Sequence, residues 1–147
     1  MIRLTVPYPP SANRYWRTTL IGRRAQTYVS AEGKAYREDV AWRARALGVQ
    51  PIAGRVALTV RLYPHRPQDW KRRQRKDPET WDDTVQCIDL GNCEKVLSDA
   101  LNGVAWIDDK QHRRIVLERM EPDDQGARLE VEVEAVPVLA RQGEVLP

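Results

Sequence analysis

The alternation of apolar and polar residues predicts four β-strands along the chain. Residues 2–6 alternate and then meet a run of prolines, which marks a short first strand entering a turn. Residues 54–63 predict a second strand, in which every other side chain is apolar. Residues 113–120 and 128–136 alternate on either side of residues 121–126, a segment of turn formers, and this pattern predicts a β-hairpin.

Apolar residues at helical spacing predict two main helices. The first runs from about 31 to 47, where Ser30 is a suitable N-cap and Glu32 suits the positive end of the helix dipole. The second starts near Asn92 as N-cap and ends at residues 102–103. The apolar faces consist of Tyr36, Val40, Ala44 and Leu47 in the first helix, and of Val96, Leu97, Ala100 and Leu101 in the second.

Together these elements predict a single α/β domain, α+β-like in layout, in which a small mixed β-sheet packs against the two helices. The expected element order is β-α-β-loop-α-β-β. At 147 residues the chain suits one hydrophobic core. We expect residues 1–137 to form the domain and residues 138–147 to be a C-terminal tail.

The remaining stretches lack a regular pattern and are predicted to be loops. One lies between the first strand and the first helix, and the other comprises residues 64–86. The second is long for a loop of a compact domain, and loops of that length usually serve a function. A short element at residues 104–107 leads from the second helix into the next strand.

The composition narrows the class of protein. Hydrophobic residues make up 41% and charged residues 31% of the chain, which is typical of a globular protein. No run approaches the roughly 20 apolar residues of a membrane span, and the N-terminus lacks the apolar stretch of a signal peptide. We therefore expect a cytoplasmic protein without a membrane partner. Cys87 and Cys93 lie far in sequence from His65 and His112, so we expect reduced thiols rather than a zinc site.

Positive charge is unevenly distributed. The net charge is only +3, but residues 61–76 are strongly basic, with Asp69 as their one acid. The segment after the first strand mixes arginines with aromatic side chains, a combination suited to phosphate contacts and to stacking on unpaired bases. A nucleic acid is one partner that fits, and a solvated basic loop is the alternative. The candidate DNA-binding residues are Asn13, Arg14, Tyr15, Arg17, Arg23, Arg24, Lys71, Arg72, Arg73, Arg75 and Lys76.

Acidic residues form the most suggestive chemical cluster. Asp89 precedes the second helix, while Asp108 and Asp109 follow its return segment, so the three carboxylates could converge at one end of the domain. Aspartate oxygens favour Mg²⁺, with Mn²⁺ as a substitute, and an ion held in this way can serve the cutting of a phosphodiester bond. Adjacent aspartates are also common in turns, which is the simpler interpretation.

Lys95 and Asp99 lie on one side of the second helix at i,i+4 spacing. One interpretation is a surface salt bridge, worth a few tenths of a kcal/mol. The other has Lys95 contacting the phosphate that is cut, with Asp99 orienting it.

Separated blocks of the sequence resemble, in order, the RusA family of Holliday-junction resolvases, which phages and prophages encode widely. They are Val6–Arg17, with its Pro-Pro-Ser-x-Asn signature, Val29–Gly33 with Ala35–Arg37, Ile88–Lys95, Asp99–Gly103 and Trp106–Gln111. The Ile88–Lys95 and Asp99–Gly103 blocks are similar to the family's Asp-x-Asp-Asn-x-x-Lys and Asp-Ala-Leu motifs, and the last block to its Asp-Asp-x-Gln motif. Agreement in several ordered blocks argues against a chance match.

The resemblance implies a homodimeric, Mg²⁺-dependent endonuclease that cuts four-way DNA junctions by paired symmetric nicks and needs no small-molecule cofactor. By position, Asp89 and Asp109 would be catalytic, metal-binding carboxylates, and Asp108 a further metal ligand. Lys95 would face the phosphate, with Asn92 and Asp99 in supporting places.

One position departs from the family pattern, because the second aspartate of the Asp-x-Asp-Asn motif falls on Gly91. Either Asp108 or Asp99 completes the metal shell, or the chain binds junctions and cuts them poorly. An active enzyme is favoured, since the other acids and Lys95 are in place. The competing interpretations are a noncatalytic protein that binds branched DNA and a nuclease acting on flaps or forks.

Overall fold

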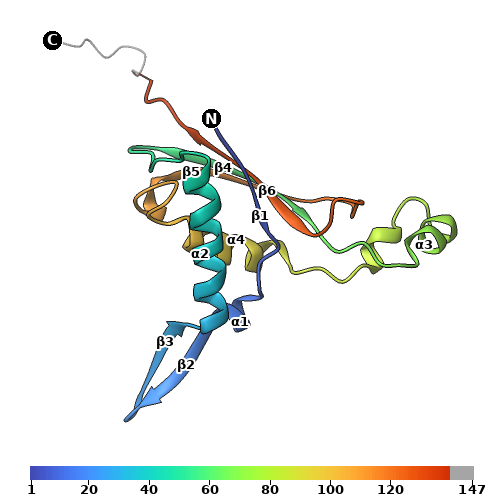
Figure 1. Ribbon diagram of the computed structural model, residues 1–147, viewed down its shortest axis with the longest axis horizontal. Helices are drawn as coiled ribbons and strands as arrows, with labels where there is room; N and C mark the ends of the chain where they lie inside the picture. The colour runs from blue at the N-terminus through green and yellow to red at the C-terminus, as the bar shows by residue number, and fades with distance from the viewer. Residues whose placement is uncertain (140–147) are drawn as a thin grey trace.

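A four-stranded mixed sheet lies at the centre of the fold (Figure 1). The structure, a computed structural model, describes residues 1–139, so most of the predicted tail 138–147 lies outside the described residues. The strand order is β1 (Ile2–Pro7), β6 (Arg128–Ala135), β4 (Val56–Tyr63) and β5 (His112–Arg119). β4 runs antiparallel to β6 and parallel to β5, which confirms the predicted mixed sheet.

The predicted hairpin of residues 113–120 and 128–136 is wrong, although both of its strands exist. β5 and β6 do not pair with each other, because β4 lies between them. β4 is the most buried of the three, with Leu58, Val60 and Leu62 all at 1% exposure or less. Burial therefore gives β4 the central place, and the parallel β4–β5 pair is joined through a helix, as parallel pairs must be.

Two helices pack on one face of the sheet and form a single core with it. α2 (Ala31–Ala46) begins where predicted, since the Ser30 side chain accepts a hydrogen bond from the Gly33 N–H at 3.0 Å. α4 (Leu90–Leu101) begins earlier than predicted, because its N-cap is Asp89 and not Asn92. Most of the predicted apolar stripes are buried; Leu47, just past the end of α2, is 63% exposed.

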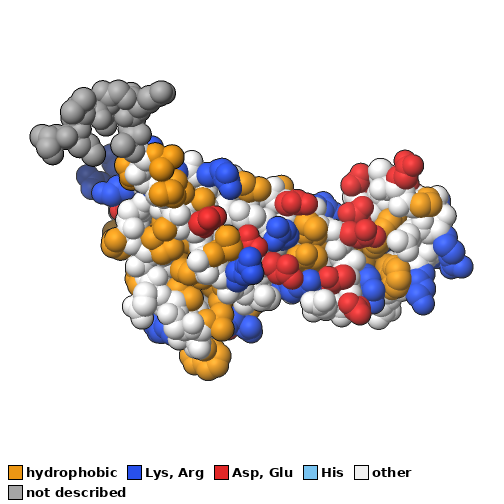
Figure 2. All heavy atoms as spheres, turned by 90° about the horizontal axis from the view of Figure 1, so that it is seen from above, with side chains coloured by type: hydrophobic (Ala, Val, Ile, Leu, Met, Phe, Trp, Pro, Cys, Tyr) orange, Lys and Arg blue, Asp and Glu red, His pale blue; other side chains and the backbone are white. Residues whose placement is uncertain are grey.

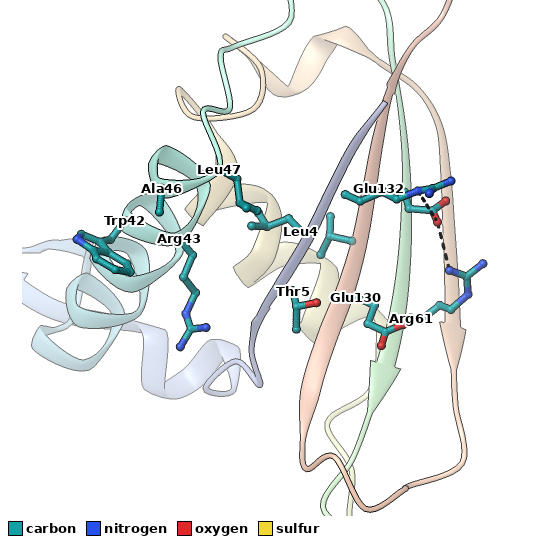
Figure 3. Close-up of a pocket in the computed structure, with 11 residues that line it drawn as sticks. Leu4, Thr5, Trp42, Arg43, Ala46, Leu47, Arg61, Glu130 and Glu132 are labelled. Atoms are coloured by element: carbon teal, nitrogen blue, oxygen red, sulfur yellow. Dashed lines mark ion pairs between the residues drawn. The ribbon is translucent and has the colours of Figure 1, made fainter.

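The opposite face of the sheet is charged. Glu132 of β6 lies 3.9 Å from Arg3 of β1 and 3.5 Å from Arg61 of β4 (Figure 3). These side chains line a groove of about 470 Å³ that continues around the β1 edge to Trp42 and Leu47. Because the ion pairs are partly exposed, they add little to stability.

A β-hairpin and an arm project from this body (Figure 1). The hairpin is formed by β2 (Trp16–Ile21) and β3 (Arg24–Val29), which follow the short helix α1 (Ala12–Tyr15). The arm comprises residues 64–88 and holds α3 (Trp70–Lys76) and a 3₁₀ turn, η1 (Trp81–Thr84).

Both projections were predicted to be loops, and that prediction is wrong for their regular parts. α3 buries no residue, and the hairpin buries only parts of its base. Without a buried face the sequence has no apolar period to detect. The arm is a small lobe built around Trp81, whose indole N–H donates to Glu121 at 2.8 Å.

Residues 104–107 form a turn with isolated bridges rather than a regular strand. Cys87 and Cys93 are free thiols, as expected. Within residues 1–139, no helix is long and apolar enough to cross a membrane.

Candidate active site

Asp89 is an exposed carboxylate fixed at the start of α4. One of its oxygens accepts a hydrogen bond from the Asn92 backbone N–H and the other accepts one from the Asn92 side-chain amide, both at 2.8 Å. The hydrogen bonds from Asn92, helped by the charge of Lys95, hold the pKa of Asp89 below its usual value. Asp89 therefore presents a negative charge at neutral pH.

The N-terminal segment is tied to this helix end. The Asn92 side-chain oxygen accepts a hydrogen bond from the Ala12 N–H at 3.1 Å, and the Tyr8 hydroxyl oxygen accepts one from the Ile88 N–H at 2.6 Å. These contacts hold the Pro-Pro-Ser-x-Asn block against the Asp-x-x-Asn block. Tyr8 was missed in the sequence because its role depends on a contact distant along the chain.

Gly91 lies in the first turn of α4 beside this carboxylate. A Cβ at this position would lie 3.5 Å from Asp89 Oδ1, and no other atom within 4 Å would oppose it. The residue is exposed, and its φ is not positive. The backbone would therefore accept a side chain here, and a carboxylate at position 91 would lie next to that of Asp89.

Lys95 and Asp99 do not form the predicted pair. Asp99 accepts a hydrogen bond from the buried Tyr15 hydroxyl and lies 3.9 Å from Arg37. Lys95 is exposed, and across residues 1–139 it has no hydrogen bond or ion pair. Asp99 thus joins α4 to α1 and α2, while Lys95 stays available near Asp89.

Asp108 and Asp109 lie in a tightly held turn after α4. Asp108 caps the 3₁₀ helix η2 (Asp109–Gln111) by accepting a hydrogen bond from the Lys110 N–H at 2.9 Å. Asp109 Oδ1 accepts a hydrogen bond from the Trp106 indole N–H at 3.0 Å. Both aspartates are exposed.

Gln111 anchors this turn to the body. Its side-chain oxygen accepts hydrogen bonds from the N–H groups of Ile107 and Asp108, at 2.7 and 2.8 Å. Its side-chain amide donates to the carbonyls of Ile52 and Gly54, both at 2.7 Å. The glutamine of the Asp-Asp-x-Gln block is therefore structural, and it fixes where the two aspartates lie.

The two parts of the candidate site lie at opposite ends of α4. Ile88, next to Asp89, contacts Tyr8, which directly follows β1. The last residue of β1 pairs with Arg128 of β6, and Arg128 pairs with Tyr63 of β4, so Asp89 lies at the Tyr63 end of the sheet. Gln111 instead contacts the segment that enters β4 at its Val56 end. The 12 residues of α4 separate these ends by about 18 Å.

The predicted convergence of Asp89 with Asp108 and Asp109 is therefore not found within one chain. Across the described residues 1–139, no three histidine, cysteine, aspartate or glutamate side chains gather closely enough to hold a metal ion.

The chain matches a known protein family over most of its length. The family model described as "Endodeoxyribonuclease RusA" matches residues 7–134. This chain belongs to the RusA endodeoxyribonuclease family. RusA membership places it among the enzymes that cut phosphodiester bonds of DNA, as the ordered sequence blocks had suggested.

Two curated relatives show how much of the chain the RusA likeness covers. The protein is 35% identical, over 131 residues, to "Crossover junction endodeoxyribonuclease RusA" of Escherichia coli (strain K12), which covers 88% of this chain and 91% of the relative. It is 34% identical over the same length, with the same coverage, to the protein of that name from Enterobacteria phage 82. The similarity thus extends over nearly the whole of both chains.

A large groove borders Asp89 in this RusA-family chain. It has a volume of about 1190 Å³ and runs between the arm and α2. Its walls include Tyr8, Arg14, Tyr36, Arg73, Asp89 and Asn92. The groove places Asp89 on a concave surface that is open to a large substrate.

The predicted DNA-binding residues fall into three groups. Tyr15 is buried and bonded to Asp99, so it is not available to stack on a base. Some arginines have acidic partners: Arg14 lies 2.7 Å from Glu32, and Arg72 and Arg73 each lie 2.9 Å from Asp69. Within the described part of the chain, no ion pair is formed by Arg17, Arg23, Arg24, Lys71, Arg75 or Lys76, and Asn13 is exposed.

The arm carries much of this unpaired charge. Lysine and arginine side chains gather at the far end of the lobe, with acidic side chains beside them (Figure 2). Arg66 and Lys71 lie over the Trp70 ring, at 4.4 and 5.7 Å from its centre, a contact that composition alone did not indicate.

Proposed function

We propose that this protein is a divalent-metal-dependent endonuclease that resolves four-way DNA junctions by paired symmetric nicks. The observation that carries the proposal is the ionised carboxylate of Asp89, fixed at the edge of a large groove beside the unpaired Lys95. The relatives named crossover junction endodeoxyribonucleases support the substrate class.

The donor set suits Mg²⁺ or Mn²⁺, but one chain does not assemble it. Asp89, Asp108 and Asp109 offer only carboxylate oxygens, the ligands that these hard cations prefer. Since Asp89 and the Asp108–Asp109 turn lie at opposite ends of α4, we propose that the ligands come from two copies of the chain.

The free edge of β5 offers a place for the second copy to bind. β5 is the last strand of the sheet, so one side of its backbone pairs with nothing within residues 1–139. Ile115 and Val116 on this strand are 40% and 39% exposed. β5 has eight residues and no proline, and its ladder with β4 is irregular only at Arg113, so the stretch from Arg114 onward is suited to pairing with another strand.

From Arg114 to Glu118, the sequence of β5 is self-complementary in one antiparallel register. A two-fold axis at Val116 would place Val116 opposite its own copy and Ile115 opposite the second copy's Leu117. It would also place Arg114 opposite the second copy's Glu118, a pairing of unlike charges on one face. This register keeps the helices of both copies on the same face of a continuous sheet.

This arrangement would place opposite ends of the two sheets side by side. In an antiparallel β5–β5 pair, the end of one sheet that holds Asp109 meets the end of the other that holds Asp89. Two equivalent sites would result, one for each strand to be cut, which accounts for paired nicks.

In such a site, a bound divalent ion would activate water and neutralise the charge that develops on the phosphate. Lys95 would contact a phosphate oxygen and stabilise the same charge from α4. Asn92 holds Asp89 in the orientation that it has in the free chain, and Trp106 does the same for Asp109.

The first test is cleavage of a labelled four-way junction, beside flapped and linear DNA of the same sequence, with Mg²⁺, with EDTA and with Asp109→Asn. Paired nicks that need both metal and Asp109 support the proposal. Equal cutting of flaps or linear DNA would contradict junction resolution and favour a broader nuclease.

Mixing two inactive variants tests the shared site. In a mixed dimer of Asp89→Asn with Asp109→Asn, one composite site carries both changes and the other carries neither. Recovery of single nicks on mixing supports ligands from two chains. No recovery, with mixed dimers shown by a tag on one variant, contradicts it.

Gly91 favours a second candidate function, a protein that binds branched DNA without cutting it. The carboxylate expected at position 91 is absent, which leaves fewer ligands for a metal ion. Tight junction binding that is unchanged by EDTA or Asp109→Asn, without any products, would select this alternative.

A further inference from the structure

Among the residues that the structure describes, the β2–β3 hairpin is the least buried regular element. Only Trp16 and Val29, the pair at its base, are partly buried, and all the other residues of both strands are exposed. A two-stranded ribbon without a packed face gains little stability from burial. Its length and sequence therefore need an explanation other than the core.

The turn of the hairpin gives its tip a defined shape. Gly22 has a φ of +63°, while Arg23 does not have a positive φ. This combination matches the tight two-residue turn that places glycine first and keeps the strands in register. Thr18 and Thr27, which face each other across the strands, are joined by a hydrogen bond of 3.2 Å. The hairpin is thus a formed element and not a loose loop.

The tip presents two large apolar side chains to solvent. Leu20 is 73% exposed and Ile21 is 61% exposed, and neither belongs to the hydrophobic core. Because side chains alternate along a strand, Leu20 lies on the face with Ala25 and Ile21 on the face with Arg24. The tip is therefore apolar on both faces, which gives it the form of a wedge.

The charge of the hairpin identifies the partner that such a wedge fits. Residues 16–29 contain Arg17, Arg23 and Arg24 and no acidic residue. Within residues 1–139 none of these arginines forms an ion pair. DNA has stacked, largely apolar bases between two rows of anionic phosphates. An apolar tip between unpaired arginines therefore complements DNA. A second hairpin would instead bring like charges together.

The reach and anchoring of the hairpin suit this partner. Six residues of ladder span about 20 Å, well beyond the depth of about 8.5 Å of a DNA major groove. At its base, the Ser30 hydroxyl donates to the Arg14 carbonyl at 2.6 Å, and the Ala12 N–H donates to Asn92. The hairpin is thus fixed to the helix end that carries Asp89.

We propose that the β2–β3 hairpin is a DNA wedge that separates bases at a branch point. Leu20 and Ile21 enter between the bases, and Arg17, Arg23 and Arg24 bind the phosphates on either side. The wedge rests on the proposed function, since it requires branched DNA as the substrate, and it adds a residue-level account of how the branch is opened.

The test uses a four-way junction with 2-aminopurine at the branch point, in EDTA, so that binding is measured without cutting. The fluorescence of this base rises when it leaves the stack. The wild-type chain is expected to raise the signal several-fold. The Leu20→Ser/Ile21→Ser variant is expected to keep its affinity within about tenfold, since its arginines are unchanged, and to lose most of the fluorescence rise.

Two further variants serve as controls. Leu47→Ser removes an equally exposed apolar side chain from the end of α2 and should leave both affinity and fluorescence unchanged. Arg23→Ala/Arg24→Ala should weaken binding and lower the slope of log K against log salt by about 2, while the signal at saturation stays high. Circular dichroism and thermal unfolding check that each variant is folded.

The outcomes separate the wedge from the function on which it rests. Preferential junction binding by the wild type without a fluorescence rise overturns the wedge and leaves resolution of junctions standing. A rise that the tip variant retains also overturns it. A wild type without preference for branched over linear DNA overturns both proposals.

Discussion

Gly91 stands beside the carboxylate of Asp89, so that a Cβ on residue 91 would lie 3.5 Å from Asp89 Oδ1. We predict that Gly91→Asp improves metal use. A second carboxylate here would add a ligand, and the Mg²⁺ concentration for half-maximal junction cutting should fall by roughly tenfold, equivalent to about 1.4 kcal/mol. A Mg²⁺ titration of the cleavage rate measures this.

Two variants at the same position serve as controls. Gly91→Asn has the same size without the charge and should leave the Mg²⁺ requirement unchanged. Gly91→Ala should raise the free energy of unfolding by about 0.5–1 kcal/mol, because glycine weakens a helix. An equal gain in metal use from aspartate and asparagine would contradict a ligand role for the new carboxylate.

Asp89→Asn should separate the capping of α4 from catalysis. Asparagine is as good an N-cap as aspartate, so thermal unfolding should change little. Junction cutting should fall by at least about 100-fold, equivalent to about 2.7 kcal/mol, because the charge is lost. Asp89→Ala, which removes both roles, should in addition lower the melting temperature. Normal cutting by Asp89→Asn would exclude Asp89 as a metal ligand.

Gln111→Ala should release the turn that carries Asp108 and Asp109. Four hydrogen bonds are lost, and at about 1 kcal/mol net for each the free energy of unfolding should fall by roughly 2–4 kcal/mol. Cutting should fall with it at temperatures where the variant is still folded. Gln111→Glu keeps the acceptor and loses the two donors, so its stability should lie between the two.

The ion pair of Asp123 with Arg128 should make stability depend on pH. Both contacts between the side chains are 2.8 Å, and the hydrogen bonds from Arg128 hold the pKa of Asp123 below its usual value. A lowered pKa stabilises the fold above the ordinary value of about 4, and this contribution is lost as the pH falls through the lowered value.

Asp123→Asn should therefore cost about 1 kcal/mol at pH 7, because Arg128 loses its ion pair with Asp123 but keeps its contacts to Glu130 and the Gly126 carbonyl. Urea unfolding at pH 7 and at pH 3 measures the difference between wild type and variant, which should shrink at the lower pH. A difference independent of pH would show that the charge of Asp123 is not the source of the effect.

The arm should contribute affinity for DNA without sequence preference. Replacing Lys71, Arg75 and Lys76 by alanine should lower the slope of log K against log salt by roughly 2–3, because each phosphate contact releases counterions. Arg3→Ala, on the opposite face of the sheet, should leave the slope unchanged. Binding measured across a salt series distinguishes the two.

Local signals in the sequence predicted some elements well. Ser30 with Glu32 identified the start of α2, and alternation identified β1 and β4. The start of α4 was placed at Asn92 because both Asp89 and Asn92 are good caps, and only the structure shows that Asn92 donates to Asp89. The hairpin at Gly22-Arg23 was missed, since exposed strands carry no apolar period.

Features that depend on distant contacts could not be predicted from the sequence. β5 and β6 alternate as partners would, and only the burial of β4 places that strand between them. The direction of α4 follows from this topology. For that reason the sequence was compatible with Asp89 and Asp109 lying close together, while the fold holds them at opposite ends of the helix.

The arm leaves the sheet at Tyr63 and returns to α4 at Asp89, and both points lie at one end of the body. Insertions or deletions around α3, at the far end of the arm, would leave the path of the sheet and the helix as it is, because the contacts between arm and body involve Trp81, Val85 and Ile88. The length of the arm is thus a variable that evolution can change independently of the chemistry. A longer or shorter arm would change the size of the DNA surface that the protein contacts.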